Sequence, residues 1–152
     1  MFSYLYLIAT IVLAHASTPT ITLEVRDPCK DASFHRWEFE LPKKQSVGQV
    51  TMDLFDREKV PYIGSELGMN SILSTPVGEP SMEFPGPGQL KVYGWCFELN
   101  GVQPTEMPDK IEMKSGDHLV WFYGYALWKD REWKTYCSPA HESPLKSYCE
   151  KK

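Results

Sequence analysis

The sequence predicts an α+β domain in which one helix packs against a mixed β-sheet and a disulfide-pinned tail follows. Three observations predict it. Apolar residues alternate with polar ones between residues 20 and 41, and a single segment after them changes to spacings of three and four. Four cysteines are spread from residue 29 to residue 149. With 152 residues, the chain has the usual size of one domain.

Two strands are predicted at the start of this domain. Between Thr20 and Arg26 every second residue is apolar, which is the period of a half-buried strand. Asp27-Pro28 ends this run. From Trp37 the alternation returns, so residues 34–41 are expected to form a second strand, antiparallel to the first.

The one predicted helix covers residues 46–59. Val47, Val50 and Leu54 recur at spacings of three and four, and Ser46 is a suitable N-cap because a glutamine follows three residues later. Between residues 60 and 90 glycines and prolines cluster, which fixes turns and permits only short strand pieces, such as one near residues 69–73.

Two more strands follow. Residues 91–99 (KVYGWCFEL) end at Asn100-Gly101, a dipeptide that adopts the positive φ angles of a tight hairpin turn, so a partner strand is expected directly after it. Residues 118–125 (HLVWFYGY) are rich in aromatic and β-branched side chains and form the last predicted strand. Residues 129–152 show no sustained period and are expected to be a tail. A β-grasp arrangement fits this order over residues 17–128.

The N-terminal sixteen residues resemble a signal peptide. They are apolar and small, and they end in Ala14-His15-Ala16, a pattern that signal peptidases cleave. The apolar run falls short of the roughly 20 residues that cross a bilayer. We therefore expect a secreted or periplasmic protein that begins near Ser17 and has no membrane span in its mature chain.

Charge and cysteine content narrow the class further. The net charge of −4, with interspersed acidic and basic residues, provides no basic stripe for nucleic acid. An even number of cysteines in an exported chain favours disulfides, and three pairings are open. The short separation of Cys137 and Cys149 favours their pairing, which leaves Cys29 to Cys96.

Two blocks of sequence are similar to the C-terminal domain of the transcobalamin and intrinsic factor family. Residues 94–101 read GWCFELNG, and residues 111–123 read IEMKSGDHLVWFY, so a Gly-Trp strand with an Asn-Gly turn precedes a Gly-Asp turn and a Val-Trp-x-Tyr strand. The resemblance covers residues 20–125. It implies a β-grasp lid that covers one face of cobalamin, although this chain has no helical barrel for the other face.

The resemblance also implies where a ligand binds. Aromatic and backbone groups near the hairpin touch the ligand in that family, which points to Trp95, Phe97, Asn100, Gly101, Trp121 and Tyr123. On an alternating strand Trp95 and Phe97 share one face, so they are candidates for the core as well as for ligand contact. Cys96 departs from the family pattern.

The leading hypothesis is a non-enzymatic binding module for cobalamin or another small planar molecule. The alternative is a structural module that docks a protein through its aromatic or strand edge. A minor alternative is a copper-binding electron carrier that uses Cys137 and His141. No catalytic site is predicted, because Ser65 lacks the Gly-x-Ser-x-Gly elbow.

Overall fold

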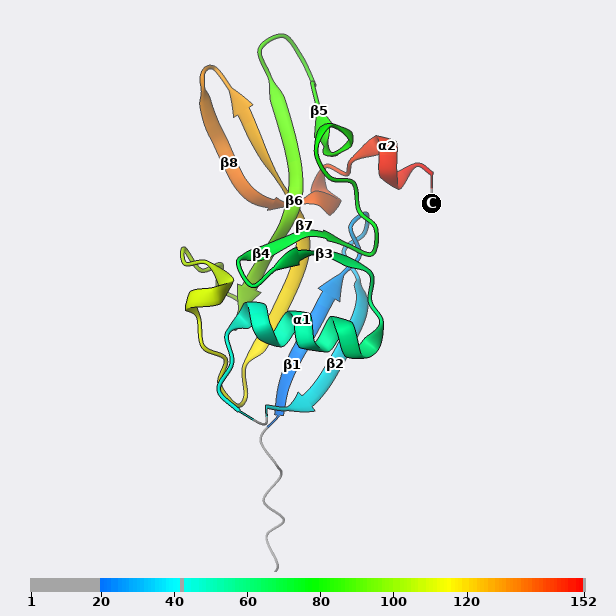
Figure 1. Cartoon of the computed structure of the whole chain (residues 1–152). Helices are drawn as coiled ribbons and strands as arrows, with labels where there is room; N and C mark the ends of the chain where they lie inside the picture. The colour runs from blue at the N-terminus through cyan, green and yellow to red at the C-terminus, as the bar shows by residue number, and fades with distance from the viewer. Residues whose placement is uncertain (1–19, 42, 152) are drawn as a thin grey trace, which may run out of the picture.

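The α+β class is confirmed, because the chain is mostly sheet with few helices. The computed structural model describes residues 20–41 and 43–151, so the predicted signal peptide lies outside the described residues. The main sheet is mixed, with the strand order β2-β1-β7-β6-β5 and with β8 paired to β7; β3 and β4 form a separate two-stranded sheet. Figure 1 shows the layout.

The described chain contains eight strands and five helical elements. The strands are β1 (Thr20–Arg26), β2 (Ser33–Glu40), β3 (Tyr62–Ser65), β4 (Gly68–Ile72), β5 (Met82–Glu83), β6 (Leu90–Leu99), β7 (His118–Lys129) and β8 (Glu132–Pro139). The helices are α1 (Val47–Glu58) and the short α2 (Lys146–Cys149), and three 3-10 turns are η1 (Glu79–Ser81), η2 (Pro108–Lys110) and η3 (Ala140–Glu142).

The predicted first hairpin and helix are confirmed. β1 pairs antiparallel with β2 and parallel with β7. α1 begins after Ser46, whose Oγ accepts a hydrogen bond from the backbone N–H of Gln49, and ends at Lys59 in the left-handed conformation. Its apolar stripe packs against the inward face of β1. The buried residues are Ile21, Leu23 and Val25 of β1 and Val47, Val50, Leu54 and Phe55 of α1.

The expected partner strand after Asn100-Gly101 is not there, and this prediction is wrong. The tight turn itself forms, with φ of 54° at Asn100 and 78° at Gly101, and Leu99 exchanges backbone hydrogen bonds with Val102. The chain then leaves the sheet, because the prolines at positions 104 and 108 lack the N–H groups that a ladder needs. β6 pairs instead with the distant β7.

The tail contains a strand that the sequence pattern did not indicate. β7 runs on to Lys129, and β8 returns beside it as an antiparallel neighbour. Residues of β8 are mostly exposed or half-buried on both faces, so no apolar alternation marks them. In Figure 1 the β5–β6 and β7–β8 connections project together at the end of the molecule far from α1.

The preferred disulfide pairing is also wrong. The bonds are Cys29–Cys149 and Cys96–Cys137, with Cα atoms 5.6 Å and 5.9 Å apart. The short separation of Cys137 and Cys149 in the sequence does not bring them together in space. α2 places Cys149 next to the turn after β1, whereas β8 places Cys137 against β6. Both tail cysteines are therefore bonded to the body of the domain.

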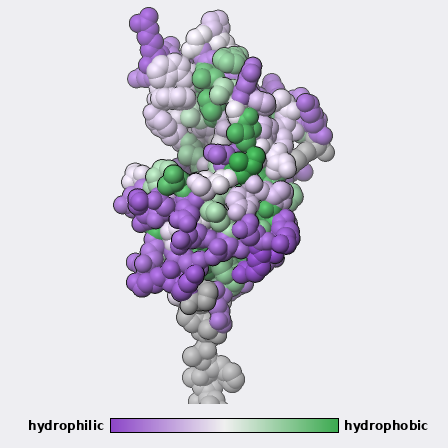
Figure 2. Space-filling view, viewed as in Figure 1, coloured by the Kyte–Doolittle hydropathy of each residue, from purple (hydrophilic) through white to green (hydrophobic). Residues whose placement is uncertain are grey.

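The surface divides into two regions. Figure 2 shows hydrophilic residues gathered over α1 and the lower strands, while paler and hydrophobic residues gather over the projecting part that contains β6 and β8. Among the residues that the structure describes, none of the helices has the length and apolar character needed to cross a bilayer.

Candidate ligand-binding cleft

The predicted ligand residues with the largest rings lie in the core, on the face of the sheet that α1 covers. Trp121 is 1% exposed, Tyr123 2% and Trp95 9%. The indole N–H of Trp121 donates to Thr51 Oγ1 of α1 at 3.0 Å, and that of Trp95 donates to Thr75 Oγ1 at 2.7 Å. These hydrogen bonds fix both rings inside the domain.

Of the remaining predicted residues, Phe97 lies on the same face of the sheet, and Asn100 and Gly101 lie at the end of β6. The ring of Phe97 is half-buried and lies 5.3 Å from that of Trp121. Asn100 and Gly101 form the turn, where the Asn100 side-chain oxygen accepts from the backbone N–H of His118 at 2.9 Å. The structure therefore brings the four aromatic rings together and places the turn beyond them. Contact of these residues with a ligand stays a prediction.

The opposite face of β6 and β7 carries a gap in its side chains. Gly94 and Gly124 lie directly opposite each other in the two strands, and a glycine pair leaves the backbone bare. A Cβ atom placed on Gly94 would meet nothing within 4 Å. A Cβ on Gly124 would lie 3.1 Å from Cys96 Sγ and 3.2 Å from the Ser138 carbonyl oxygen. The space over Gly94 is open, whereas Gly124 lets β8 approach.

β8 forms a wall over this bare floor. Its pairing with β7 is irregular between Tyr125 and Trp128, and Cys137 has a positive φ of 49°. The disulfide to Cys96 ties β8 down onto β6. Trp133 and Tyr136 remain 38% and 70% exposed, and their rings lie 6.1 Å apart.

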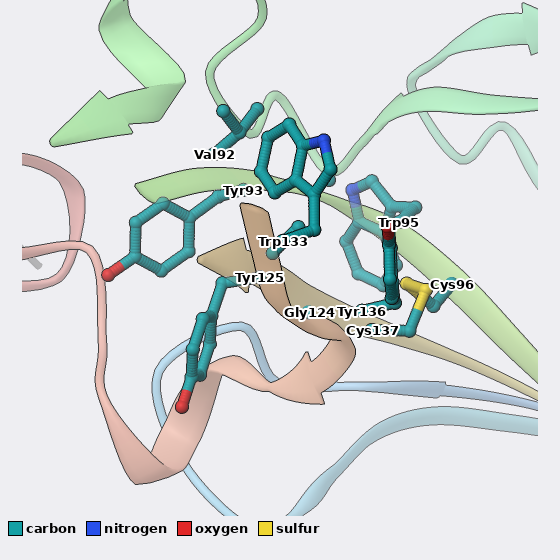
Figure 3. Close-up of a pocket in the computed structure, with 11 residues that line it drawn as sticks. Val92, Tyr93, Trp95, Cys96, Gly124, Tyr125, Trp133, Tyr136 and Cys137 are labelled. Atoms are coloured by element: carbon teal, nitrogen blue, oxygen red, sulfur yellow. A yellow bond between two sulfur atoms is a disulfide. The ribbon is translucent and has the colours of Figure 1, made fainter. Parts of the chain in front are cut away.

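Together these residues enclose an open cleft of about 340 Å³, drawn in Figure 3. Its lining is Val92, Tyr93, Gly94, Trp95, Cys96, Gly124, Tyr125, Ala126, Trp133, Tyr136 and Cys137. None of these side chains carries a formal charge. The polar side-chain groups from β8 are the indole N–H of Trp133 and the hydroxyl of Tyr136, whereas Tyr93, Trp95 and Tyr125 alternate to the opposite face of the sheet from the two glycines. Such a surface binds by ring stacking and by burial of apolar area.

The neighbourhood of Tyr93 and Tyr125 is fixed by polar contacts. The Tyr93 hydroxyl lies 2.9 Å from Glu83 Oε2 and 2.8 Å from the Ser143 carbonyl oxygen, so one proton serves two acceptors. Burial, and next the hydrogen bond to Glu83, raise the pKa of Tyr93. Lys91 Nζ lies 4.7 Å from the centre of the Tyr125 ring, a cation–π distance. These contacts hold both rings in place on the face of the sheet opposite the two glycines.

The described residues contain no cluster of three or more histidine, cysteine, aspartate or glutamate side chains arranged to hold a metal ion. The sulfur of Cys137 is bonded to that of Cys96. The copper hypothesis therefore lacks the thiolate that it needs.

The sequence matches no known protein family, and no curated protein is significantly similar to it. Among solved structures, one of a candidate metal-binding protein from Ruminococcus gnavus is 17% identical and covers 68% of this chain and 94% of that chain, with a TM-score of 0.43. A likeness this distant carries no argument about fold or function. The transcobalamin resemblance stays a prediction.

Trp133 and Tyr136 of the cleft lie in the segment that was expected to be a tail, so sequence reasoning missed them. The two glycines were a usable signal. A glycine inside a strand pattern marks a close approach of backbone or a site left bare, and Gly94 and Gly124 each interrupt a run of large residues. Their pairing across the sheet becomes visible only with the register of β6 and β7.

Proposed function

We propose that this chain is a secreted, non-enzymatic binding module whose cleft between β6, β7 and β8 takes a small, flat, uncharged aromatic molecule. The observation that carries the proposal is the open space over Gly94, next to the exposed rings of Trp133 and Tyr136 that β8 brings up over Gly124. Two disulfides support an oxidising compartment, such as the cell exterior or the periplasm.

The size of the cleft supports a ligand of one or two rings. About 340 Å³ lies at the lower end of the roughly 300–1,000 Å³ that drug-sized ligands occupy. A corrin ring is much larger, so this cleft alone would cover only part of cobalamin. Cobalamin is included in the proposal because the family resemblance implies it. We expect this chain to bind cobalamin weakly unless a second protein covers the other face of the ring.

A β-grasp fold is part of the same proposal. The strand order β2-β1-β7-β6-β5, the parallel pairing of β1 with β7 and the position of α1 between the first hairpin and the later strands support it. The placement of a transcobalamin-like domain over residues 17–128 rests on the sequence motifs alone.

The test is a titration of the disulfide-bonded chain with naphthalene derivatives and, separately, with cobalamin, followed by tryptophan fluorescence. The key variant is Gly94→Val, because a Cβ atom at this position meets nothing within 4 Å and the two further methyl groups would take up room over the floor of the cleft. We expect saturable quenching by the naphthalene probe and at least about a tenfold loss of affinity in Gly94→Val, equivalent to about 1.4 kcal/mol.

Phe84→Ala is the matched control, because Phe84 is 73% exposed and does not line the cleft. This variant should bind the probe like the unchanged chain. Equal affinity of Gly94→Val and the unchanged chain, with both folded by circular dichroism, would reject the cleft as the binding site.

A further inference from the structure

β2 lies at the border of the main sheet and has one neighbouring strand in the described chain, β1 (Figure 1). Its pairing with β1 is regular over residues 35–40. Six of its eight residues are exposed, and it contains neither proline nor lysine. Proteins commonly place these residues, or a bulge, on an open sheet edge to prevent another strand from pairing there. β2 is therefore a regular edge to which a further strand can add.

The backbone groups on the outer side of β2 can be assigned from the neighbours of β1. The N–H of Thr22 donates to a carbonyl oxygen in the turn before β7, so the next residue, Leu23, turns its backbone groups toward β2. Leu23 lies opposite Trp37, so Trp37 faces β1 while Arg36 and Glu38 face outward. Within the described part of the chain, no group is hydrogen-bonded to these outward N–H and C=O groups.

The order of charges along β2 favours one register for pairing with a second copy of the same strand. Outward residues must lie opposite outward residues, so the two-fold axis of such a pair passes through a residue position. Near the middle of β2 these positions are Arg36, Trp37 and Glu38. An axis at Arg36 or at Glu38 places two like charges directly opposite each other, which is destabilising. An axis at Trp37 instead places Arg36 opposite Glu38 of the second copy.

We propose that β2 of this chain pairs antiparallel with β2 of a second copy, about a two-fold axis at Trp37. Arg36 of each copy then exchanges backbone hydrogen bonds with Glu38 of the other, and their oppositely charged side chains lie next to each other on one face. The side chain of Arg36 is 60% exposed and contacts Glu24 through one guanidinium nitrogen. Glu38 accepts from the Thr20 hydroxyl through Oε1 alone. Both side chains therefore retain groups for the second copy.

The side chain of Trp37 supports the same register. Its ring is half-buried, stacks on His35 with ring centres 5.1 Å apart and lies 6.3 Å from the ring of Phe55 in α1. In an antiparallel pair, residues that lie opposite each other without exchanging hydrogen bonds bring their side chains closest together. The two Trp37 rings would therefore meet at the axis, where they bury apolar surface that one copy leaves in water.

The dimer does not depend on the proposed aromatic ligand. The cleft is lined by residues of β6, β7 and β8, and β1 separates these strands from β2. A dimer carries two clefts, so it would bind a surface that displays several ligands more tightly than one copy does. Because a single strand pair buries little surface, the association is expected to be weak and to depend on protein concentration.

The first test is sedimentation of the disulfide-bonded chain at concentrations from about 5 μM to about 500 μM, a range in which weak association becomes visible. We expect a shift from monomer to dimer. Glu38→Arg places an arginine opposite Arg36 of the second copy and should weaken dimerisation at least about tenfold. Glu106→Arg is the matched control, because Glu106 is exposed, lies outside β2 and undergoes the same change of charge. This control should dimerise like the unchanged chain.

Charge exchange tests the register itself. Arg36→Glu, like Glu38→Arg, places like charges opposite each other and should be monomeric alone. Each strand of one variant then carries two acidic groups at these positions and each strand of the other two basic groups, so a mixture should form a heterodimer. The two substitutions in the same chain should restore the homodimer. Circular dichroism checks that each variant is folded, since Arg36 also contacts the buried Glu24.

A backbone variant tests the strand pairing independently of charge. The N–H of Glu38 points away from β1, so Glu38→Pro removes a hydrogen bond to the second copy and none within the chain. This variant should fold and remain monomeric. Amide hydrogen exchange by NMR provides the second measurement. The amides of Arg36 and Glu38 should become at least about tenfold more protected as the concentration rises, whereas that of Trp37, which faces β1, should stay protected throughout.

Several outcomes would overturn the dimer. The unchanged chain could remain monomeric over the whole range, or the dimer could persist in Glu38→Arg and Glu38→Pro, which would place the interface elsewhere. Protection of the Arg36 and Glu38 amides that does not vary with concentration would show that the edge is covered within one chain. Binding of the naphthalene probe in any of these cases would leave the proposed function intact, and a dimer that does not bind the probe would reject the cleft alone.

Discussion

Two threonine hydroxyls satisfy the indole N–H groups of the two tryptophans in the core, Trp95 and Trp121. Thr51 on α1 accepts from the indole of Trp121 and donates to the Val47 carbonyl oxygen, and Thr75 accepts from the indole of Trp95. A buried indole N–H without a partner costs about 1–3 kcal/mol. Each tryptophan can therefore be buried only because a threonine from a different element meets it.

The two facing glycines of β6 and β7 give the sharpest prediction for single residues. Gly124→Ala should lower the free energy of unfolding by about 1–3 kcal/mol, because the new methyl group would press on the Cys96 sulfur and the Ser138 carbonyl oxygen, which the disulfide and the β7–β8 pairing hold in place. Urea unfolding followed by tryptophan fluorescence measures the change.

Gly94→Ala is the matched control in the same pair. Its methyl group meets nothing within 4 Å, and neither glycine has a positive φ that an alanine could not adopt. Reduced freedom of the unfolded chain should leave this variant as stable as the unchanged chain, or more stable by about 0.4–1 kcal/mol. Similar losses in both variants would contradict the asymmetric environment described for the pair.

At the scale of elements, the two disulfides have different structural roles. Cys96–Cys137 spans 41 residues and places β8 over the cleft, whereas Cys29–Cys149 spans 120 residues and ties α2 to the turn after β1. In the loop-entropy account their removal costs about 4 and about 5 kcal/mol. The bond with the smaller effect on stability is therefore the one that shapes the cleft.

Paired serine variants separate these tasks. Cys96→Ser with Cys137→Ser should release β8 and abolish binding of the naphthalene probe, while Cys29→Ser with Cys149→Ser should retain probe affinity at a temperature where the chain stays folded. Thermal unfolding ranks the two variants by stability, and fluorescence titration ranks them by binding. Retention of binding without Cys96–Cys137 would show that the β7–β8 pairing alone builds the wall.

Local patterns were sufficient to predict some elements and insufficient for others. β1 and α1 could be predicted because each buries one face. Apolar residues therefore recur every second residue in the strand and every three or four residues in the helix. β8 could not, because residues such as Trp133 and Tyr136 are exposed and no face of the strand is apolar throughout. The disulfide pairing and the pairing of Gly94 with Gly124 depend on which strands become neighbours in the sheet. The spacing of apolar residues along the sequence does not contain this information. The sequence showed that Trp95 and Phe97 share one face, but not that Thr75 would cover Trp95 or that Thr51 of α1 would cover the neighbouring Trp121.

For the whole molecule, buried tyrosines make stability depend on pH in the alkaline range. The hydroxyl of Tyr123 is buried and has no hydrogen-bond partner in the described residues. Burial, and next the neighbouring Tyr148, raise its pKa, and burial together with Glu83 raises that of Tyr93. In the unfolded chain both phenols ionise near their ordinary pKa of about 10.

The sign of the effect follows from this difference. Below about pH 10 the phenols are protonated in both states and stability does not change with their titration. Above it, only the unfolded chain releases the two protons, so the free energy of unfolding should fall by up to about 2.7 kcal/mol per pH unit. Tyr93→Phe combined with Tyr123→Phe should remove most of this slope, whereas Tyr136→Phe, at an exposed ring, should retain it. Urea unfolding between about pH 8 and about pH 11 measures the slopes, and equal slopes in the double variant and the unchanged chain would assign the alkaline loss to other groups.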